Sequence, residues 1–147
     1  MAFYMDELDK KLVAALAVNA RTPVSTLAAT LGLARTTVQA RLERLERSSI
    51  IAGYTVRLTD GAMEGRIRAT VLVQADTGKQ AGIIGRLKTM SNVEEAHTAS
   101  GRFDLVLQIA ASTTAELDDV LDQIGALDGV NSSESLIRLT TKIDRVL

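Results

Sequence analysis

LAATLGLARTTVQARLERLER, which spans residues 27–47, contains the small, flexible and branched residues that a helix-turn-helix requires. Ala28 is small enough to lie where two helices cross. Gly32 can adopt the positive φ of a tight turn between them. Val38 is a branched apolar residue that can hold the second helix against the first. The spacings of four and six residues between these positions predict two helices joined by a turn, the second over residues 34–47.

A further helix is predicted ahead of this pair, over residues 6–18. Its apolar side chains recur at helical spacing and fall on one face, at Leu8, Leu12, Ala15 and Leu16. Asp6 is placed to be the N-cap of this helix. For the helix that ends before Gly32, Thr22 is the expected N-cap, because Pro23 then occupies the first helical turn, where proline is tolerated.

The polar side of residues 34–47 carries the side-chain types that bind DNA. In a helix-turn-helix, the second helix enters the major groove with its N-terminal residues toward the base edges. Arginine can pair with guanine and glutamine with adenine, while threonine offers a hydroxyl or a methyl group. The predicted base-reading residues are Arg35, Thr36, Thr37 and Gln39. The predicted phosphate-binding residues, which give affinity rather than sequence choice, are Arg41, Arg44 and Arg47.

The distribution of charge along the chain also favours DNA binding by the N-terminal half. Residues 1–60 contain eight basic and six acidic side chains, whereas the rest of the chain contains nine and twelve. A basic N-terminal half suits a nucleic-acid partner. The alternative is an amphipathic helix whose charges only pair with one another, since Glu43 and Arg47 are four residues apart.

The second half of the chain has a different periodicity. Alternating apolar residues predict strands over 66–75, 93–99, 103–111 and 135–143. Helices are predicted over 79–90 and after an N-cap at Thr113 or Thr114. The order βαββαβ predicts a ferredoxin-like sheet with helices on one face only, and so an α+β protein. On the bare face, Thr70, Leu72 and Gln74 suit burial against another chain, which predicts at least a dimer.

The connection between the two halves is β-prone and then polar. Residues 50–56 predict a strand or a hinge, and Gly61 and Gly65 mark a linker. The expected domains are a helix-turn-helix over residues 1–50, a strand hinge or linker over 51–65, and a ferredoxin-like effector-binding and oligomerisation domain over 66–147.

The composition argues against several other classes of protein. The chain has no cysteine and a single histidine, His97, so it offers no thiolate nucleophile and no obvious metal site. No hydrolase motif such as G-x-S-x-G is present. We therefore expect no enzyme activity, no cofactor and no metal. No apolar run approaches the ~20 residues of a membrane span, and the N-terminus lacks the pattern of a signal peptide, so a cytoplasmic protein is expected.

Five stretches of the chain carry a family pattern: Met5–Asp9, Leu27–Leu33, Val38–Leu45, Ile50–Tyr54 and Gly101–Asp104. With these stretches the chain resembles the Lrp/AsnC family, the feast/famine regulators of bacteria and archaea. The resemblance implies a winged-helix-like or plain helix-turn-helix, a strand hinge and a βαββαβ effector domain. It also implies dimers that assemble into octamers, with amino-acid effectors held near the contacts between dimers.

Two positions depart from the family pattern. Ala34 stands where relatives usually have a serine that caps the second helix of the motif, and the loss of such a cap typically costs ~1 kcal/mol. Ser49 stands where the family often has glycine.

The loop from Gly101 to Asp104 is the expected effector site. Gly101 allows close approach of a ligand, and Asp104 can accept hydrogen bonds from an α-ammonium group. Thr98 and Arg102 are polar groups in reach of this loop, and Arg102 can attract a carboxylate. By resemblance, the ligand also meets the last strand of a neighbouring subunit around Leu136 and Arg138. The alternative is an ordinary β-turn in which Asp104 only satisfies backbone N–H groups.

These expectations combine into a sequence-specific DNA-binding transcriptional regulator that responds to an amino acid or a related small metabolite. One alternative is a stand-alone amino-acid-binding or assembly module without specific DNA binding. A second alternative is a small enzyme built on the ferredoxin-like domain, against which the missing acid–base residues argue.

Overall fold

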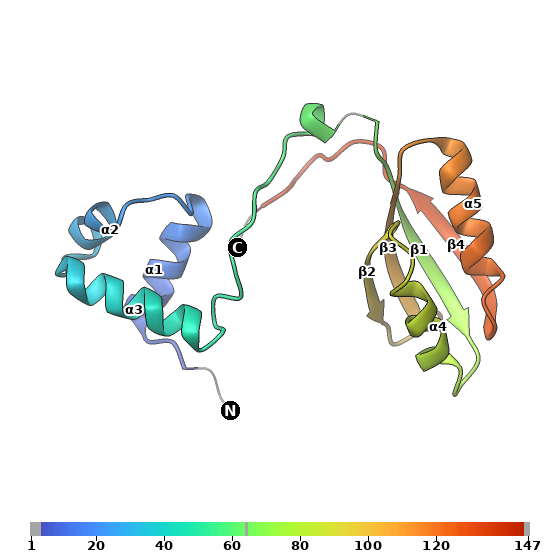
Figure 1. Cartoon of the computed structure of the whole chain (residues 1–147), viewed down its shortest axis with the longest axis horizontal. Coiled ribbons are helices and arrows are strands. Elements are labelled where there is room, and N and C mark those ends of the chain that lie inside the picture. Colours follow the sequence, from blue (N-terminus) through green and yellow to red (C-terminus); the bar gives the residue numbers. More distant parts are fainter. Residues whose placement is uncertain (1–3, 64, 146–147) are drawn as a thin grey trace. The chain divides into compact units, whose positions relative to one another are not determined.

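The computed structural model describes residues 4–63 and 65–145 and divides into two compact units. One unit comprises Met1–Arg57 with Ile143–Leu147, and the other comprises Leu58–Lys142. Figure 1 shows helices without a sheet in the first unit, and a sheet with helices in the second. Residues 1–3 and 146–147 of the expected domains, and residue 64 of the expected linker, lie outside the described residues. Within the described part, no helix is long and apolar enough to cross a membrane.

The first unit contains the three expected helices. They are α1 (Glu7–Val18), α2 (Val24–Leu31) and α3 (Arg35–Arg47). Their apolar faces meet in one core, made of Leu12, Leu16, Leu27, Ala28, Val38, Leu42 and Leu45. Asp6 is the N-cap of α1, as expected, because its carboxylate accepts a hydrogen bond of 2.8 Å from the Asp9 backbone N–H. The Asp9 carboxylate in turn accepts from the Asp6 N–H at 3.1 Å, which completes a capping box.

The turn between α2 and α3 has the geometry that the sequence predicts. Gly32 ends α2 in the left-handed region, with φ of 66°. Ala28 is 4% exposed and Val38 is fully buried, so both lie in the contact between the helices. The expected cap on α2 is wrong. Thr22 instead donates its hydroxyl to the Asn19 carbonyl at 2.7 Å, and Pro23 is the N-cap without a side-chain hydrogen bond.

The chain that leaves α3 is extended but forms no strand. Ser49 has φ of 58°, a left-handed conformation that favours glycine. Ile50 and Ile51 pack against the helical core, while residues 52–58 are exposed. A strand requires a neighbouring strand for its backbone hydrogen bonds, and within the described residues this segment has none. Of the two expectations for residues 50–56, the strand is therefore absent from the described residues and the hinge stays a prediction. The described part of this unit also lacks a wing.

The second unit has the βαββαβ order. After a short 3-10 helix, Asp60–Met63, come β1 (Ile67–Ala75), α4 (Gln80–Leu87), β2 (Val93–Thr98), β3 (Leu105–Ala111), α5 (Thr114–Gly125) and β4 (Val130–Ile137). The sheet is antiparallel, in the order β2-β3-β1-β4. The expected last strand over residues 135–143 is wrong. The strand begins earlier because Val130–Ile137 pairs with Ala69–Ala75 of β1, and it ends close to where its partner strand begins.

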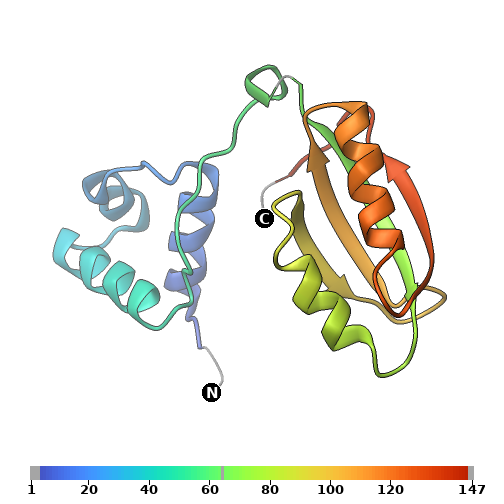
Figure 2. The same cartoon turned by 45° about the vertical axis from the view of Figure 1, so that its right-hand side comes forward.

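Both helices of this unit cover the same face of the sheet (Figure 2). Thr113 is the N-cap of α5, since its hydroxyl accepts from the Glu116 N–H at 3.1 Å. The core beneath the helices consists of the buried aliphatic residues Ala69, Val71, Val73, Ile83, Leu87, Leu105, Leu107, Ile109, Ala111, Leu117, Val120 and Ile124. The opposite face carries Thr70, Leu72 and Gln74 of β1, which are only partly buried, so among the described residues no layer covers this face of the sheet.

Two neighbouring serines give a direct test of the backbone after α3. Replacement of Ser49 by glycine should raise the free energy of unfolding by about 0.5–1 kcal/mol, because it relieves a left-handed conformation. Ser48 has φ of −82°, so the same replacement there should lower stability by about 0.5–1 kcal/mol. Urea unfolding, followed by the helical circular dichroism signal, measures both. Shifts of the same sign would contradict the assignment of strain to Ser49.

Candidate DNA interface and ligand-binding loop

The first half of α3 presents its polar side chains to solvent. Arg35, Thr36, Thr37 and Gln39 are all exposed. Gln39 donates to the Glu43 carboxylate at 3.1 Å, one turn further along the helix. Among the described residues, no hydrogen bond or ion pair engages the side chains of the other three. This part of α3 therefore offers a guanidinium, two hydroxyls and an amide to an outside partner.

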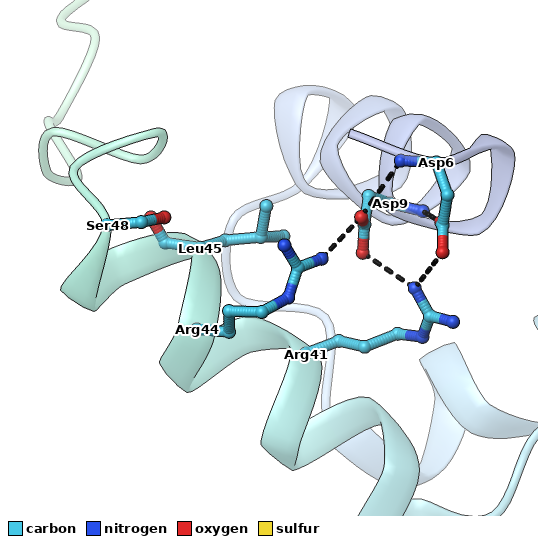
Figure 3. A network of polar contacts seen from close by, with 6 residues as sticks. All are labelled: Asp6, Asp9, Arg41, Arg44, Leu45 and Ser48. Carbon is cyan, nitrogen blue, oxygen red and sulfur yellow. Dashed lines mark hydrogen bonds and ion pairs between the residues drawn. The ribbon is translucent and has the colours of Figure 1, made fainter. Parts of the chain in front are cut away.

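The second half of α3 is tied to the start of α1 by a network of ion pairs (Figure 3). The Arg41 Nη1 lies 2.7 Å from Asp6 Oδ2 and 2.8 Å from Asp9 Oδ1. Arg44 pairs with the other oxygen of Asp9. The Asp9 side chain is 1% exposed, whereas those of Arg41 and Arg44 are 24% and 46% exposed. A buried carboxylate thus meets two cations that retain contact with water.

The ion pairs lower the pKa of both carboxyl groups. For Asp6, the hydrogen bond from Arg41 is the largest cause of the lowered pKa. For Asp9, burial is the largest influence and by itself raises the pKa, but the hydrogen bonds from Arg44 and Arg41 outweigh it and the pKa is lowered. The same contacts raise the pKa of Arg41. Both aspartates are therefore ionised at neutral pH.

The three arginines of the second half of α3 differ in what they contact. An open hollow of about 610 Å³ lies over the ion pairs and is lined by Tyr4, Asp6, Asp9, Thr36, Thr37, Ala40, Arg41 and Arg44. A second hollow, of about 460 Å³, is lined by Arg44, Arg47 and Ser48. Arg47 is exposed and takes part in no ion pair within the described residues. The Glu43–Arg47 pair, which the sequence allowed, is not among the contacts of α3.

The expected effector loop follows β2 and precedes β3. Thr98 is the exposed last residue of β2, and Gly101 has φ of 134°, which other residues rarely adopt. Asp104 is half-buried, and its Oδ2 accepts a hydrogen bond of 2.8 Å from the Ala75 N–H. The Asp104 N–H donates to the Val73 carbonyl at 2.8 Å. The loop is thus fastened to the end of β1, and part of the Asp104 carboxylate serves the backbone.

A glutamine that the sequence analysis did not assign to the site also holds this loop. Gln74 Nε2 donates to the Arg102 carbonyl at 2.8 Å, and Gln74 Oε1 accepts from the Ser132 hydroxyl at 2.7 Å. The Arg102 guanidinium lies over the Phe103 ring, 5.3 Å from its centroid. The only sequence signal for Gln74 was its place on the bare face of the sheet, which does not disclose a contact with a loop 28 residues away.

Leu136 and Arg138 lie apart from this loop within one chain. Leu136 is 51% exposed and pairs with Thr70, which precedes Ala75 by about 17 Å along β1. The Arg138 side chain donates to Gln108 on the bare face of the sheet. A ligand that touches both the loop and these residues must therefore meet them on different chains. In the described part of the chain, no group of three His, Cys, Asp or Glu side chains is arranged to hold a metal ion.

The first unit is a three-helix domain whose last helix exposes basic side chains. The second unit is a βαββαβ sheet with one uncovered face and a loop that is hydrogen-bonded to β1. Together they define a DNA-binding transcriptional regulator with a ligand-binding domain. Residues 5–46 match the AsnC-type helix-turn-helix domain, and residues 68–147 match the Lrp/AsnC ligand binding domain. The chain belongs to the Lrp/AsnC family of transcriptional regulators.

Individual relatives agree over almost the whole length. The HTH-type transcriptional regulator FL11 of Pyrococcus furiosus is 27% identical over 135 residues, which cover 92% of this chain and 89% of the relative. The structure of E. coli AsnC superimposes with a TM-score of 0.88 at 23% identity and covers 99% of both chains. A transcriptional regulator of Neisseria meningitidis, solved as an L-Met complex, gives a TM-score of 0.85 at 22% identity and covers 97% of this chain and 94% of its own.

The lowered pKa values of Asp6 and Asp9 predict loss of stability in acid. Unfolded aspartates titrate near pH 3.9, so the ionised pair favours the folded state above about pH 4, and this contribution is lost as the pH falls through the lowered folded-state values. Asp9→Asn should be less stable at pH 7 by about 1.5–3 kcal/mol and should lose less on acidification. Urea unfolding between pH 7 and pH 2.5 measures both effects.

Glu7→Gln is the matched control, since Glu7 contacts only the exposed Lys10, at 2.6 Å, among the described residues. Its unfolding should follow that of the unmodified protein at every pH. An Asp9→Asn protein with an unchanged acid transition would show that the stability is governed by other groups.

Proposed function

We propose that this protein is a sequence-specific regulator that reads duplex DNA with the first half of α3 and responds to an amino acid or a related small metabolite. The observation that carries the proposal is the exposed set of Arg35, Thr36, Thr37 and Gln39 at the start of the helix that enters the major groove in this motif. Phosphate contacts are assigned to the arginines further along α3.

The proposed division of labour follows the sequence boundaries. Residues 1–50 bind DNA, residues 51–65 connect, and residues 66–147 assemble the protein and bind the effector. The function is regulatory binding rather than catalysis, and by analogy with its bacterial and archaeal relatives we place the protein in the cytoplasm. The bare face of the sheet supports a homodimer, because Leu72 and Leu136 would otherwise remain partly in water. Four such dimers form the proposed octamer.

Variants of base-reading residues and of phosphate-binding residues should affect DNA binding differently. Arg35→Ala and Gln39→Ala should each reduce the preference for the best DNA site by ~1–3 kcal/mol, the usual worth of a bidentate base contact. Arg47→Ala should weaken binding to every sequence about equally. Titration of each variant against the best DNA site, selected with the unmodified protein, and against a scrambled duplex at the same salt concentration measures the change in preference. Equal losses on both duplexes for Arg35 and Gln39 would remove them from base recognition.

We propose that the effector binds at the loop that runs from Gly101 to Asp104. An amino acid needs an acceptor for its ammonium group and donors for its carboxylate close together. Asp104 Oδ1 accepts no hydrogen bond within the described residues, and the Arg102 guanidinium is exposed. Supporting analogy comes from the Neisseria relative, which was solved with L-Met. Contact with Leu136 and Arg138 of a neighbouring subunit would let the ligand favour one assembly over another.

Asp104→Asn tests this site without dismantling the loop, because the amide oxygen can still accept from the Ala75 N–H. Calorimetry across the twenty amino acids at millimolar concentration should find a ligand for the unmodified protein. The variant should bind it at least about tenfold more weakly, since a hydrogen bond to a charged group contributes ~1.5–3 kcal/mol.

Sedimentation with and without the ligand should show dimers or larger species whose distribution the ligand changes, by the ~1–3 kcal/mol usual for such coupling. Asp128→Asn is the control, because Asp128 lies elsewhere in this unit and pairs with Lys79 at 3.0 Å. Should no amino acid bind or change the assembly, the second domain would be an assembly module only.

A further inference from the structure

The ion-pair network gives the arginines of α3 unequal freedom to contact DNA. Arg41 contacts two carboxylates and is the most buried of the three. Arg44 contacts one carboxylate and is about half exposed, and it lines both hollows beside α3. Arg47 is exposed and contacts none within the described residues. These contacts rank the arginines along a single helix.

The charges within the network balance. Asp6 and Asp9 supply two negative charges, and Arg41 and Arg44 supply two positive charges. An arginine whose charge is already balanced by a protein carboxylate adds little net charge to the interface, so its contact with a phosphate releases few counterions. The number of phosphates that a protein neutralises determines how steeply its DNA affinity falls with salt. The network therefore has a measurable consequence outside the folded protein.

We propose that Asp9, with Asp6 beside it, is a positioning residue of the DNA interface. It commits Arg41 to the protein and holds Arg44 at the edge of the interface, so that Arg44 and Arg47 make the phosphate contacts. This replaces the sequence-based assignment of Arg41 to phosphate binding. The inference rests on the proposed DNA-binding function of α3 and adds which of its cations bind DNA.

Because Asp9 is buried, we expect its ion pair with Arg41 to remain when DNA binds. Its side chain is 1% exposed, so departure of both arginines would leave an unpaired charge in the interior. Arg44 can turn toward a phosphate while Arg41 still satisfies Asp9. The reverse exchange is opposed by Arg41's lower exposure and by its second carboxylate, Asp6.

The first test compares three arginine variants in the full-length protein. Binding to random duplex DNA is measured over a range of salt concentrations for Arg41→Gln, Arg44→Gln and Arg47→Gln. The slope of log affinity against log salt should become shallower by about 0.9 per DNA-contacting chain for Arg44→Gln and Arg47→Gln. It should stay unchanged for Arg41→Gln. A slope for Arg41→Gln as shallow as that for Arg47→Gln would overturn the proposal.

The second test releases the arginines. Asp9→Asn should bind random DNA more tightly, with a salt slope steeper by up to about 0.9 per chain, and should prefer the selected site less. A purely structural role for Asp9 would instead weaken binding to both duplexes equally at an unchanged slope, and that result would overturn the proposal.

Glu7→Gln is the matched control, because it removes one negative charge from the same helix without touching α3. It should shift the affinity for both duplexes alike and leave the preference between them unchanged. If Asp9→Asn fails to fold, the three arginine variants still decide the proposal. If the unmodified protein binds no duplex, the proposed function fails as well, whereas an anomalous slope for Arg41→Gln alone overturns only the inference.

Discussion

The carboxylate of Asp9 is almost completely buried, and a charge in that position has to be paired. The pairing partners, Arg41 and Arg44, lie on two successive turns of α3. The buried charge therefore fixes how α3 lies against the start of α1. Asp9 also closes the capping box that begins α1. The Asp9 side chain therefore caps α1, fixes the packing of α3 against α1 and pairs with two of the cations on α3.

In the second unit the corresponding constraint is a sheet covered on one face only. The covered face holds an aliphatic core, which explains how a chain with 3% aromatic residues still forms a closely packed domain. The bare face carries polar contacts between strands, such as Thr70 to Gln108 at 3.0 Å, and the Gln74 amide that joins β4 to the effector loop. The same residues thus lie at the proposed subunit contact and behind the proposed ligand site.

Local signals in the sequence predicted local structure well. Asp6, Gly32 and Thr113 occupy the helix-terminal roles that their chemistry favours, and the alternation of residues 66–75 predicted the buried face of β1. Two expectations that depended on a distant partner were wrong or remained open. Residues 50–56 have strand-forming side chains but no partner strand in the part of the chain that the structure describes, and β4 lies earlier than its apolar pattern suggested because β1 sets its position.

The sequence by itself determined the helix-turn-helix, the βαββαβ order and the family, because caps, turns and hydrophobic periodicity act over a few residues. Only the tertiary structure decided which arginines are engaged. Arg41 and Arg44 meet Asp9 across 32 and 35 residues, and Asp104 meets Ala75 across 29. In the sequence, Arg41, Arg44 and Arg47 are three equivalent cations on one helix. Burial of a single carboxylate makes them different, and burial is a property of the packed chain.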